Sequence, residues 1–183
     1  MSPKNPRNIR VSFTREDEFS DSPRPGIINK EDFKDWTFES TETETLLKTD
    51  EITLKINTAT ASYSWFDKNG KSLLREREKD SRSLEKFDIY KTVDARTEKI
   101  RTADGEKSVI TDSKKEAAGH SWHSRLNLVF REGEELYGLG QHEEGFGSLR
   151  GNMIYLHQAN KKIALPMLVS SLGYGILTGT YSP

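Results

Sequence analysis

The chain of 183 residues is long enough for one domain, and 33% apolar against 31% charged residues indicates a thin core under a strongly solvated surface. Its 28 Lys and Arg nearly balance its 29 Asp and Glu, which argues against nucleic-acid binding and against a polybasic membrane-binding surface. The absence of cysteine excludes disulfides and thiolate metal sites, and no apolar run reaches the roughly 18 residues that a membrane-spanning helix needs.

Alternation of apolar and polar residues at a period of two predicts several strands along the chain. A polar, proline-bearing start over residues 1–8 is expected to form a flexible tail. Strands are expected in the segments 9–13, 50–57, 62–66, 71–76, 121–130, 163–171 and 174–179. A loop rich in proline and glycine is expected at residues 20–27. Helical periodicity is weak, and its best candidates, residues 28–36 and 81–87, are both short.

Two dipeptides carry the turn chemistry that closes β-hairpins. Asn69-Gly70 lies between two of the predicted strands, and Asp104-Gly105 lies within the polar region 72–119. This region is very polar for a sheet, so we expect long hairpins solvated on both faces, or partial disorder. Many strands separated by turn signals predict an all-β, antiparallel sandwich with few short helices, rather than a parallel α/β sheet.

The segment EELYGLGQHEEGFGSLRG, residues 134–151, is the first candidate for a chemical site because His142, Glu143 and Glu144 stand together in it. A metal-binding helix would need a second His at the spacing His-Glu-x-x-His, and that residue is missing. In an extended segment the two glutamates point to opposite faces. A polar loop tip is therefore favoured over direct chemistry.

Two other patterns give weaker signals. His120 and His123 are three residues apart in a predicted strand, which places them on opposite faces and disfavours a shared metal. Gly138-x-Gly140 lacks the third glycine and the following helix of a dinucleotide-binding fingerprint. Among the many acidic residues, the sequence singles out no carboxylate pair for glycoside hydrolysis.

The C-terminal third of the chain resembles glycoside hydrolase family 31, which contains α-glucosidases, α-xylosidases and related transglycosylases. The matching residues of its structural motif are Tyr137, Gly138, Gly140, Gln141, Arg150 and Gly151. An apolar strand interrupted by Pro166 and a Gly-Tyr-Gly-Ile-Leu segment at residues 173–177 follow in the family order. The resemblance implies the family's N-terminal galactose-mutarotase-like β-sandwich, or supersandwich, over residues 9–183. A proline inside a strand implies an edge or a bulge.

The resemblance also implies what the chain lacks. The family's catalytic barrel would follow Pro183, so we expect an incomplete domain that has no catalytic residues and is inactive alone. Trp65-x-Asp67 resembles part of the family's nucleophile motif, but it opens a hairpin turn and is interpreted as turn chemistry. The parent enzyme would be a retaining α-glycosidase acting on an oligosaccharide or glycoside. No metal ion and no cofactor are implied, and the compartment stays open.

In this family one loop of the N-terminal domain reaches the rim of the active site. The matching segment YLHQANKK, residues 155–162, places Gln158 and Asn160 where they would contact the sugar on the leaving-group side. Amides suit that task because they both donate to and accept from sugar hydroxyls, and the alternative is that they cap a turn. The face formed by the glycine segment and residues 163–169 is expected to meet the barrel, and to permit self-association without it.

Two further hypotheses come from other functional classes. The first is a stand-alone carbohydrate-binding or protein-interaction module. The second is a mutarotase-like enzyme, for which His142 with Glu143 is the best available pair.

Overall fold

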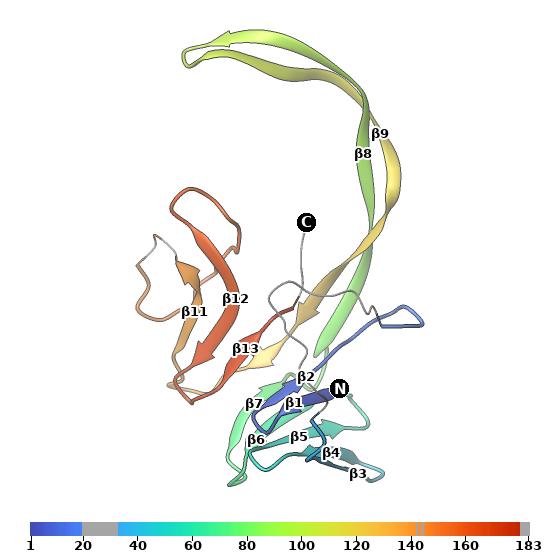
Figure 1. The fold of residues 1–183 in the computed structure, drawn as a ribbon, viewed down its shortest axis with the longest axis vertical. Coiled ribbons are helices and arrows are strands. Elements are labelled where there is room, and N and C mark those ends of the chain that lie inside the picture. The colour runs from blue at the N-terminus through green and yellow to red at the C-terminus, as the bar shows by residue number, and fades with distance from the viewer. Residues whose placement is uncertain (20–32, 142, 144, 180–183) are drawn as a thin grey trace. The chain divides into compact units, whose positions relative to one another are not determined.

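A computed structural model describes residues 1–19, 33–141, 143 and 145–179. Thirteen strands, all paired antiparallel, and no helix occur in these ranges (Figure 1). The predicted antiparallel all-β class is therefore confirmed. The helix predicted over residues 81–87 is wrong, because a strand runs through that segment, and the described end of the other helix candidate, residues 33–36, is not helical either. The chain divides into two compact units, Met1–Ser81 with Asn127–Pro183, and Arg82–Leu126.

The first unit contains a six-stranded sheet in the order β10-β7-β6-β5-β4-β3. Its strands are β3 (Thr37–Ser40), β4 (Glu44–Lys48), β5 (Ile52–Asn57), β6 (Tyr63–Asp67), β7 (Ser72–Glu76) and β10 (Leu128–Val129). Leu47, Leu54, Trp65 and Leu74 stand opposite one another across β4 to β7. The three leucines are buried and form most of the apolar core. The strands predicted at 50–57, 62–66 and 71–76 are thus confirmed.

The turn between β6 and β7 shows why Asp67 belongs to the hairpin rather than to a catalytic motif. Its carboxylate accepts hydrogen bonds from the N–H groups of Asn69 (2.9 Å) and Lys71 (2.8 Å). Gly70 supplies the positive φ of +77° that the turn requires. The hairpin predicted from Asn69-Gly70 is confirmed, and Asp67 acts as its turn-initiating side chain.

The N-terminus forms a β-hairpin that the sequence does not predict. Residues 1–8, expected to be a flexible tail, contain β1 (Ser2–Asn5), which pairs with β2 (Asn8–Arg10). The Thr49 hydroxyl also donates to the Pro6 carbonyl (2.6 Å), which ties this hairpin to the turn before β5. The strand predicted over residues 9–13 ends early, at Arg10. The loop predicted at residues 20–27 lies outside the described residues.

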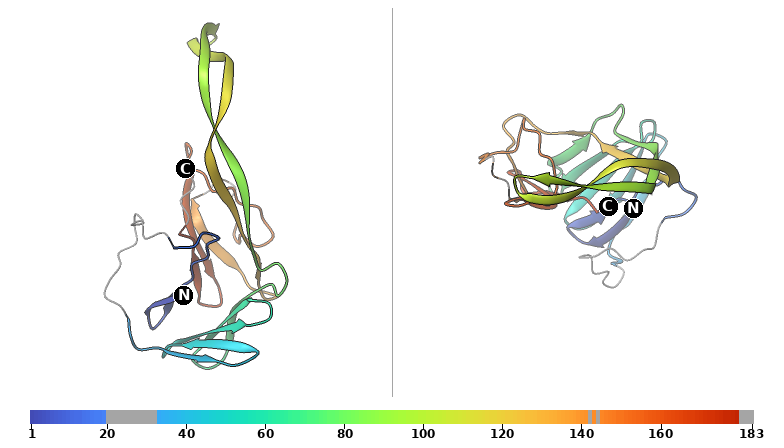
Figure 2. Two further views of the ribbon diagram at one scale, coloured as in Figure 1. Left: turned by 90° about the vertical axis from the view of Figure 1, so that its right-hand side faces the viewer. Right: turned by 90° about the horizontal axis from the view of Figure 1, so that it is seen from above.

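The second unit is one long hairpin of β8 (Arg82–Thr102) and β9 (Gly105–Leu126). Its two strands twist around each other (Figure 2). Most of its residues are exposed, as expected for hairpins solvated on both faces. Three register shifts interrupt the pairing, and such irregularities help to keep exposed strand edges from pairing with other chains. The turn is displaced by one residue from the prediction, because Gly105 already pairs with Thr102.

Asn127 ends the hairpin and separates it from β10. Its N–H donates to Ser81 O (2.8 Å), its carbonyl accepts from Arg77 N (2.9 Å), and its side chain donates to Asp80 O (2.5 Å). These contacts break the strand predicted over residues 121–130 into two strands that pair with different partners.

The remaining strands of the first unit form a sheet in the order β11-β12-β13. Its strands are β11 (Leu136–Gln141), β12 (Ile163–Ser170) and β13 (Gly175–Leu177), which confirms the strands predicted at 163–171 and 174–179. The β11–β12 register shifts between Gly138 and Gly140, next to Pro166 of β12. The bulge that Pro166 implied is therefore present, although β12 is the central strand.

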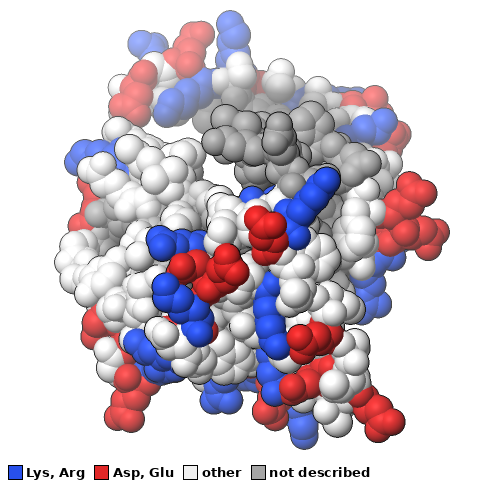
Figure 3. Space-filling model, turned by 60° about the horizontal axis from the view of Figure 1, so that its bottom comes forward, with Lys and Arg blue, Asp and Glu red and all other residues white. Residues whose placement is uncertain are grey.

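Charged side chains of both signs are interspersed on the face drawn in Figure 3. Positive and negative groups also pair across strands, as Lys48 does with Glu39 (3.1 Å) and Lys68 with Glu51 (3.3 Å). Within the described ranges, no helix has the length and apolar character that a membrane span requires.

Candidate functional site

The connection between β11 and β12 carries both residues predicted to bind sugar. Midway along it, Leu149 N donates to Leu136 O (2.8 Å), and Leu136 N donates to the Ser148 hydroxyl (3.3 Å). The chain therefore returns to the start of β11 at residues 148–150. Residues 151–162 then form a separate loop that leads into β12, which we call the 151–162 loop.

Gln158 lies near the C-terminal base of this loop, and its side-chain amide is engaged with the backbone. Nε2 donates to Ala164 O (3.4 Å), and Oε1 accepts from Ala164 N (3.3 Å). These two hydrogen bonds hold the end of the loop against the first residues of β12. This geometry is the one expected if the side chain caps a turn, because one donor and one acceptor of the amide already bind the backbone.

Asn160 lies in a tight turn two residues further on. Ala159 and Lys162 close this turn with Lys162 N donating to Ala159 O (3.1 Å), and the Lys161 backbone has a φ of +66°. A positive φ at the third of four turn residues is typical of a type II turn. Asn160 is exposed at its tip. The two predicted binding residues thus share one loop and are both exposed; Asn160 lies at the turn tip, whereas the Gln158 amide binds the Ala164 backbone.

The same loop exposes apolar side chains. Met153 is 96% and Tyr155 77% exposed, and Leu156 is also exposed. The Tyr155 and His157 rings lie together, with their centroids 4.9 Å apart. Clustered exposed apolar groups mark surfaces that contact a partner or ligand. Among the exposed large apolar side chains of the described residues, Met153 and Tyr155 are the two most exposed.

The glycines of the Tyr137–Gln141 segment allow β11 to approach β12 closely. A Cβ on Gly138 would lie 2.4 Å from Met167 O, and one on Gly140 would lie 1.9 Å from Ile163 O. Both residues also have positive φ values, of +99° and +105°. Only glycine satisfies both conditions without strain. The two glycines therefore allow the backbones of β11 and β12 to approach closely at both positions.

Next to this segment lies a buried carboxylate that the sequence interpretation overlooked. Glu134 is 1% exposed. Its Oε1 accepts hydrogen bonds from the Ser170 hydroxyl (2.5 Å) and the Tyr174 hydroxyl, and its Oε2 accepts from Arg131 N (2.7 Å). The Arg150 guanidinium donates to the main-chain carbonyl of Glu134 (3.0 Å). We call these five residues the Glu134 cluster.

The protonation states of this cluster follow from its contacts. Burial alone would raise the pKa of the Glu134 carboxyl, but the hydrogen bonds from Ser170, Tyr174 and Arg131, with the positive charge of Arg150, outweigh it and lower the pKa. Burial, followed by the hydrogen bond to Glu134, raises the pKa of the Tyr174 phenol. At neutral pH the cluster therefore holds an ionised carboxylate and a neutral phenol. Because Glu134 is buried, its carboxylate is not accessible to a substrate, which indicates a structural role.

An apolar face lies on β12. The side chains of Ile163, Leu165, Met167 and Val169 alternate along the strand and are 38–55% exposed. Tyr137 stands opposite Val169, and Leu177 opposite Met167, so the face extends onto both neighbouring strands. We call these six residues the β12 face. A contiguous apolar surface of this kind is typical of a region that packs against another part of a protein.

The other predicted candidates do not form a site in the structure. His142 and Glu144 lie outside the described residues, and Glu143 pairs with Lys161 (3.5 Å). The His123 ring stacks on Phe87 at 4.1 Å between centroids. Across the described ranges, no three His, Asp or Glu side chains are grouped so that they could hold a metal ion.

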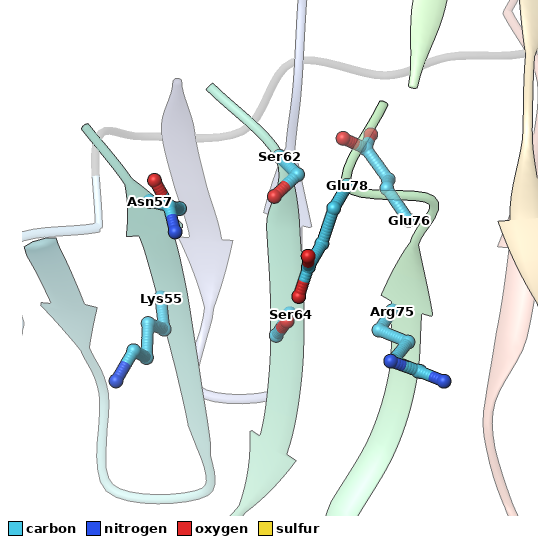
Figure 4. Close-up of a pocket in the computed structure, with 7 residues that line it drawn as sticks. All are labelled: Lys55, Asn57, Ser62, Ser64, Arg75, Glu76 and Glu78. Atoms are coloured by element: carbon cyan, nitrogen blue, oxygen red, sulfur yellow. The ribbon is translucent and has the colours of Figure 1, made fainter. Parts of the chain in front are cut away.

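A pocket of about 150 Å³ lies over β5, β6 and β7 (Figure 4). Figure 4 shows Glu78 extending over β6 toward Ser64. The charged residues that line the pocket are Lys55, Arg75, Glu76 and Glu78. Because the two signs balance and Lys55 already pairs with Glu44, the lining favours neither an anion nor a cation. We assign no site to this pocket.

These features define an all-β domain with an apolar sheet face and an exposed apolar loop. Residues 1–160 match the family described as the glycosyl hydrolase 31 N-terminal galactose mutarotase-like domain, and the chain belongs to that family. The resemblance to glycoside hydrolase family 31 and the sandwich fold that it implied are thereby confirmed.

Individual relatives agree with this assignment. The chain is 37% identical over 59 residues to a family 31 glucosidase of Pseudescherichia vulneris, and 45% identical over 60 residues to an α-xylosidase of Saccharolobus solfataricus. These matches cover 32% and 28% of this chain, but only 11% and 8% of the relatives. The chain thus spans about a tenth of the length of the curated relatives that it matches.

Solved structures of family 31 enzymes contain a region with a similar fold. A family 31 α-xylosidase from Xanthomonas citri matches 86% of this chain and 14% of its own, with a TM-score of 0.61 and 25% identity. A family 31 α-xylosidase from a soil metagenome, solved with xylose, matches 87% of this chain and 22% of its own, with a TM-score of 0.58 and 19% identity. The second likeness shows the fold alone.

Proposed function

We propose that this chain acts as the non-catalytic N-terminal domain of a retaining family 31 α-glycosidase. In this role the β12 face packs against the catalytic barrel, and the 151–162 loop forms part of the substrate-binding rim. The observation that carries the proposal is the position of the exposed loop directly before the apolar strand β12. A single contact with the barrel would cover the strand and bring the loop to the edge of its active site.

The apolar surface supports the packing role. Leu165 is 55% and Leu177 60% exposed. Complete burial of a side chain of this size is more favourable than full exposure to water by about 1.5–3 kcal/mol. Covering a face of six such residues would therefore be strongly favourable, in contrast to leaving it in water. Met153 and Tyr155 on the loop extend the same apolar character toward the proposed rim.

The exposed amide supports the rim role. Asn160 sits at a turn tip whose backbone is fixed by the Ala159–Lys162 pair, so its side chain is available to hydroxyl groups of a bound sugar. Because Gln158 is engaged with Ala164, we assign it the supporting part and Asn160 the direct contact. The α-glycosidic bond itself would be cleaved by carboxylates of the barrel.

The test is a leaving-group series in the enzyme that carries this chain. Asn160→Ala should reduce kcat/KM for substrates with a sugar leaving group by about tenfold, the loss expected for one hydrogen bond of some 1–1.5 kcal/mol. The kcat/KM for aryl glycosides, which lack those hydroxyls, should not change. Asn8→Ala, at an exposed asparagine of β2, is the matched control.

An equal change for both substrate types, or none, would argue against the rim role. Sugar binding by the isolated chain, measured by calorimetry and retained in Asn160→Ala, would instead favour a stand-alone carbohydrate-binding module.

A further inference from the structure

The Glu134 cluster joins three segments that are far apart in the sequence. The carboxylate binds the hydroxyls of Ser170, at the end of β12, and of Tyr174, in the turn before β13. Its main-chain carbonyl binds the Arg150 guanidinium at the start of the 151–162 loop. The loop, β12 and the turn after it therefore share one fixed point.

The two bases of the loop are anchored differently. At the C-terminal base, Gln158 and the Ala159–Lys162 turn use contacts within the neighbouring residues. At the N-terminal base, Arg150 reaches back to Glu134, and Asn152 N donates to Leu149 O (3.1 Å). Besides its local bonds, the N-terminal base is held by the contact of Arg150 with Glu134 and by the backbone bond from Leu149 to Leu136. The C-terminal base is held by local bonds and one exposed ion pair, Lys161 with Glu143.

We infer that Glu134 and Arg150 form a clamp that fixes the N-terminal base of the 151–162 loop and so restricts the movement of the loop that carries Asn160. This inference rests on the proposed rim function of the loop. Both residues are positioning residues, because neither side chain faces the loop tip where the sugar would bind.

The chemistry of the cluster explains why an ionised group suits this position. A buried carboxylate is stable only when it is well hydrogen-bonded, and three donors bind this one. Hydrogen bonds to a charged group are stronger than those between neutral groups. The hydrogen bonds of its side chain therefore hold Glu134 in place, so that its backbone carbonyl is a fixed acceptor for the Arg150 guanidinium.

The test uses residue-resolved amide hydrogen exchange of the 183-residue chain by NMR. Arg150→Met keeps the apolar stem of Arg150 and removes the hydrogen bond to Glu134 O. The amides of Leu149 and Asn152 should then exchange about tenfold faster or more, as expected for the loss of one charge-assisted hydrogen bond. Amides of β5 should keep their wild-type rates. Arg150→Lys, which keeps a donor, should restore part of the protection.

Arg77→Met, at an exposed arginine just after β7, is the matched control and should change none of these rates. Unchanged exchange at Leu149 and Asn152 in Arg150→Met would overturn the clamp. An equal acceleration in β5 would do the same, because it would show a global loss of stability. The readout needs no glycosidase activity, so the clamp can fail while the rim function stands, and the reverse also holds.

Discussion

Gly140→Ala is the most direct test of the close approach between β11 and β12. The new Cβ would lie 1.9 Å from Ile163 O and 2.9 Å from Leu165 N, both backbone atoms that cannot rotate away. The residue would also keep a φ of +105°, which costs a non-glycine residue about 1–3 kcal/mol. Separating the strands would weaken the pairs Gly140–Ala164 and Gln141–Ile163, at about 1 kcal/mol for each hydrogen bond. We therefore expect the free energy of unfolding to fall by about 3–5 kcal/mol.

The assay is urea denaturation followed by tryptophan fluorescence and circular dichroism. The matched control is Gly145→Ala, because Gly145 has a positive φ of +68° but no atom within 4 Å of the added Cβ. In that variant the free energy of unfolding should fall only by the cost of the left-handed backbone conformation, about 1–2 kcal/mol. Equal losses in the two variants would refute the steric reasoning. If Gly140→Ala does not fold while Gly145→Ala does, the loss of unfolding free energy in Gly140→Ala exceeds the stability of the wild-type chain. That outcome would support the steric reasoning.

Two further predictions concern the Glu134 cluster and the β12 face. Because the folded-state pKa of Glu134 is lowered, its stabilisation is present above the ordinary Glu pKa of about 4.3 and is lost as the pH falls through the folded-state value. Unfolding free energies measured across this acidic range should therefore fall more steeply for the wild type than for Glu134→Gln, and parallel profiles would contradict this. The isolated chain should self-associate through the β12 face in sedimentation velocity experiments, and Leu165→Lys should make it monomeric without loss of stability, because Leu165 is 55% exposed. A wild-type chain that stays monomeric at high concentration would contradict the second prediction.

The local elements of the fold could be predicted where their signal lies in neighbouring residues. The Asn69-Gly70 hairpin needs only a turn that accepts positive φ and two alternating strands beside it. The segment 81–87 lacks such a signal, because Leu84 and Phe87 at a spacing of three resemble a helical face. Its pairing with β9, about forty residues further along the chain, decides the structure instead.

Asn127 marks a strand boundary that could not be predicted from the sequence pattern either. The apolar alternation continues across it, so the sequence predicts one strand. The break comes from hydrogen bonds to Arg77, Asp80 and Ser81, which no periodicity reveals. Patterns of side chains predict which segments are extended, but the partner of each segment depends on contacts that are distant in sequence.

The segment 134–151 shows how residue type can mislead about the location of a site. His142, Glu143 and Glu144 have the side chains of a chemical site, but the one of them in the described ranges, Glu143, forms an exposed ion pair with Lys161. Glu134 has the same chemistry as its neighbours Glu132 and Glu135, but it is buried and binds two hydroxyl groups that lie 36 and 40 residues further along the chain. Because Glu134 is 1% exposed and accepts three hydrogen bonds from within the protein, its carboxylate is not accessible to a substrate, and we propose that it supports the loop that carries Asn160. Position in the hydrogen-bond network, rather than residue type, therefore separates the supporting residues of this domain from Asn160, which we propose to contact the sugar.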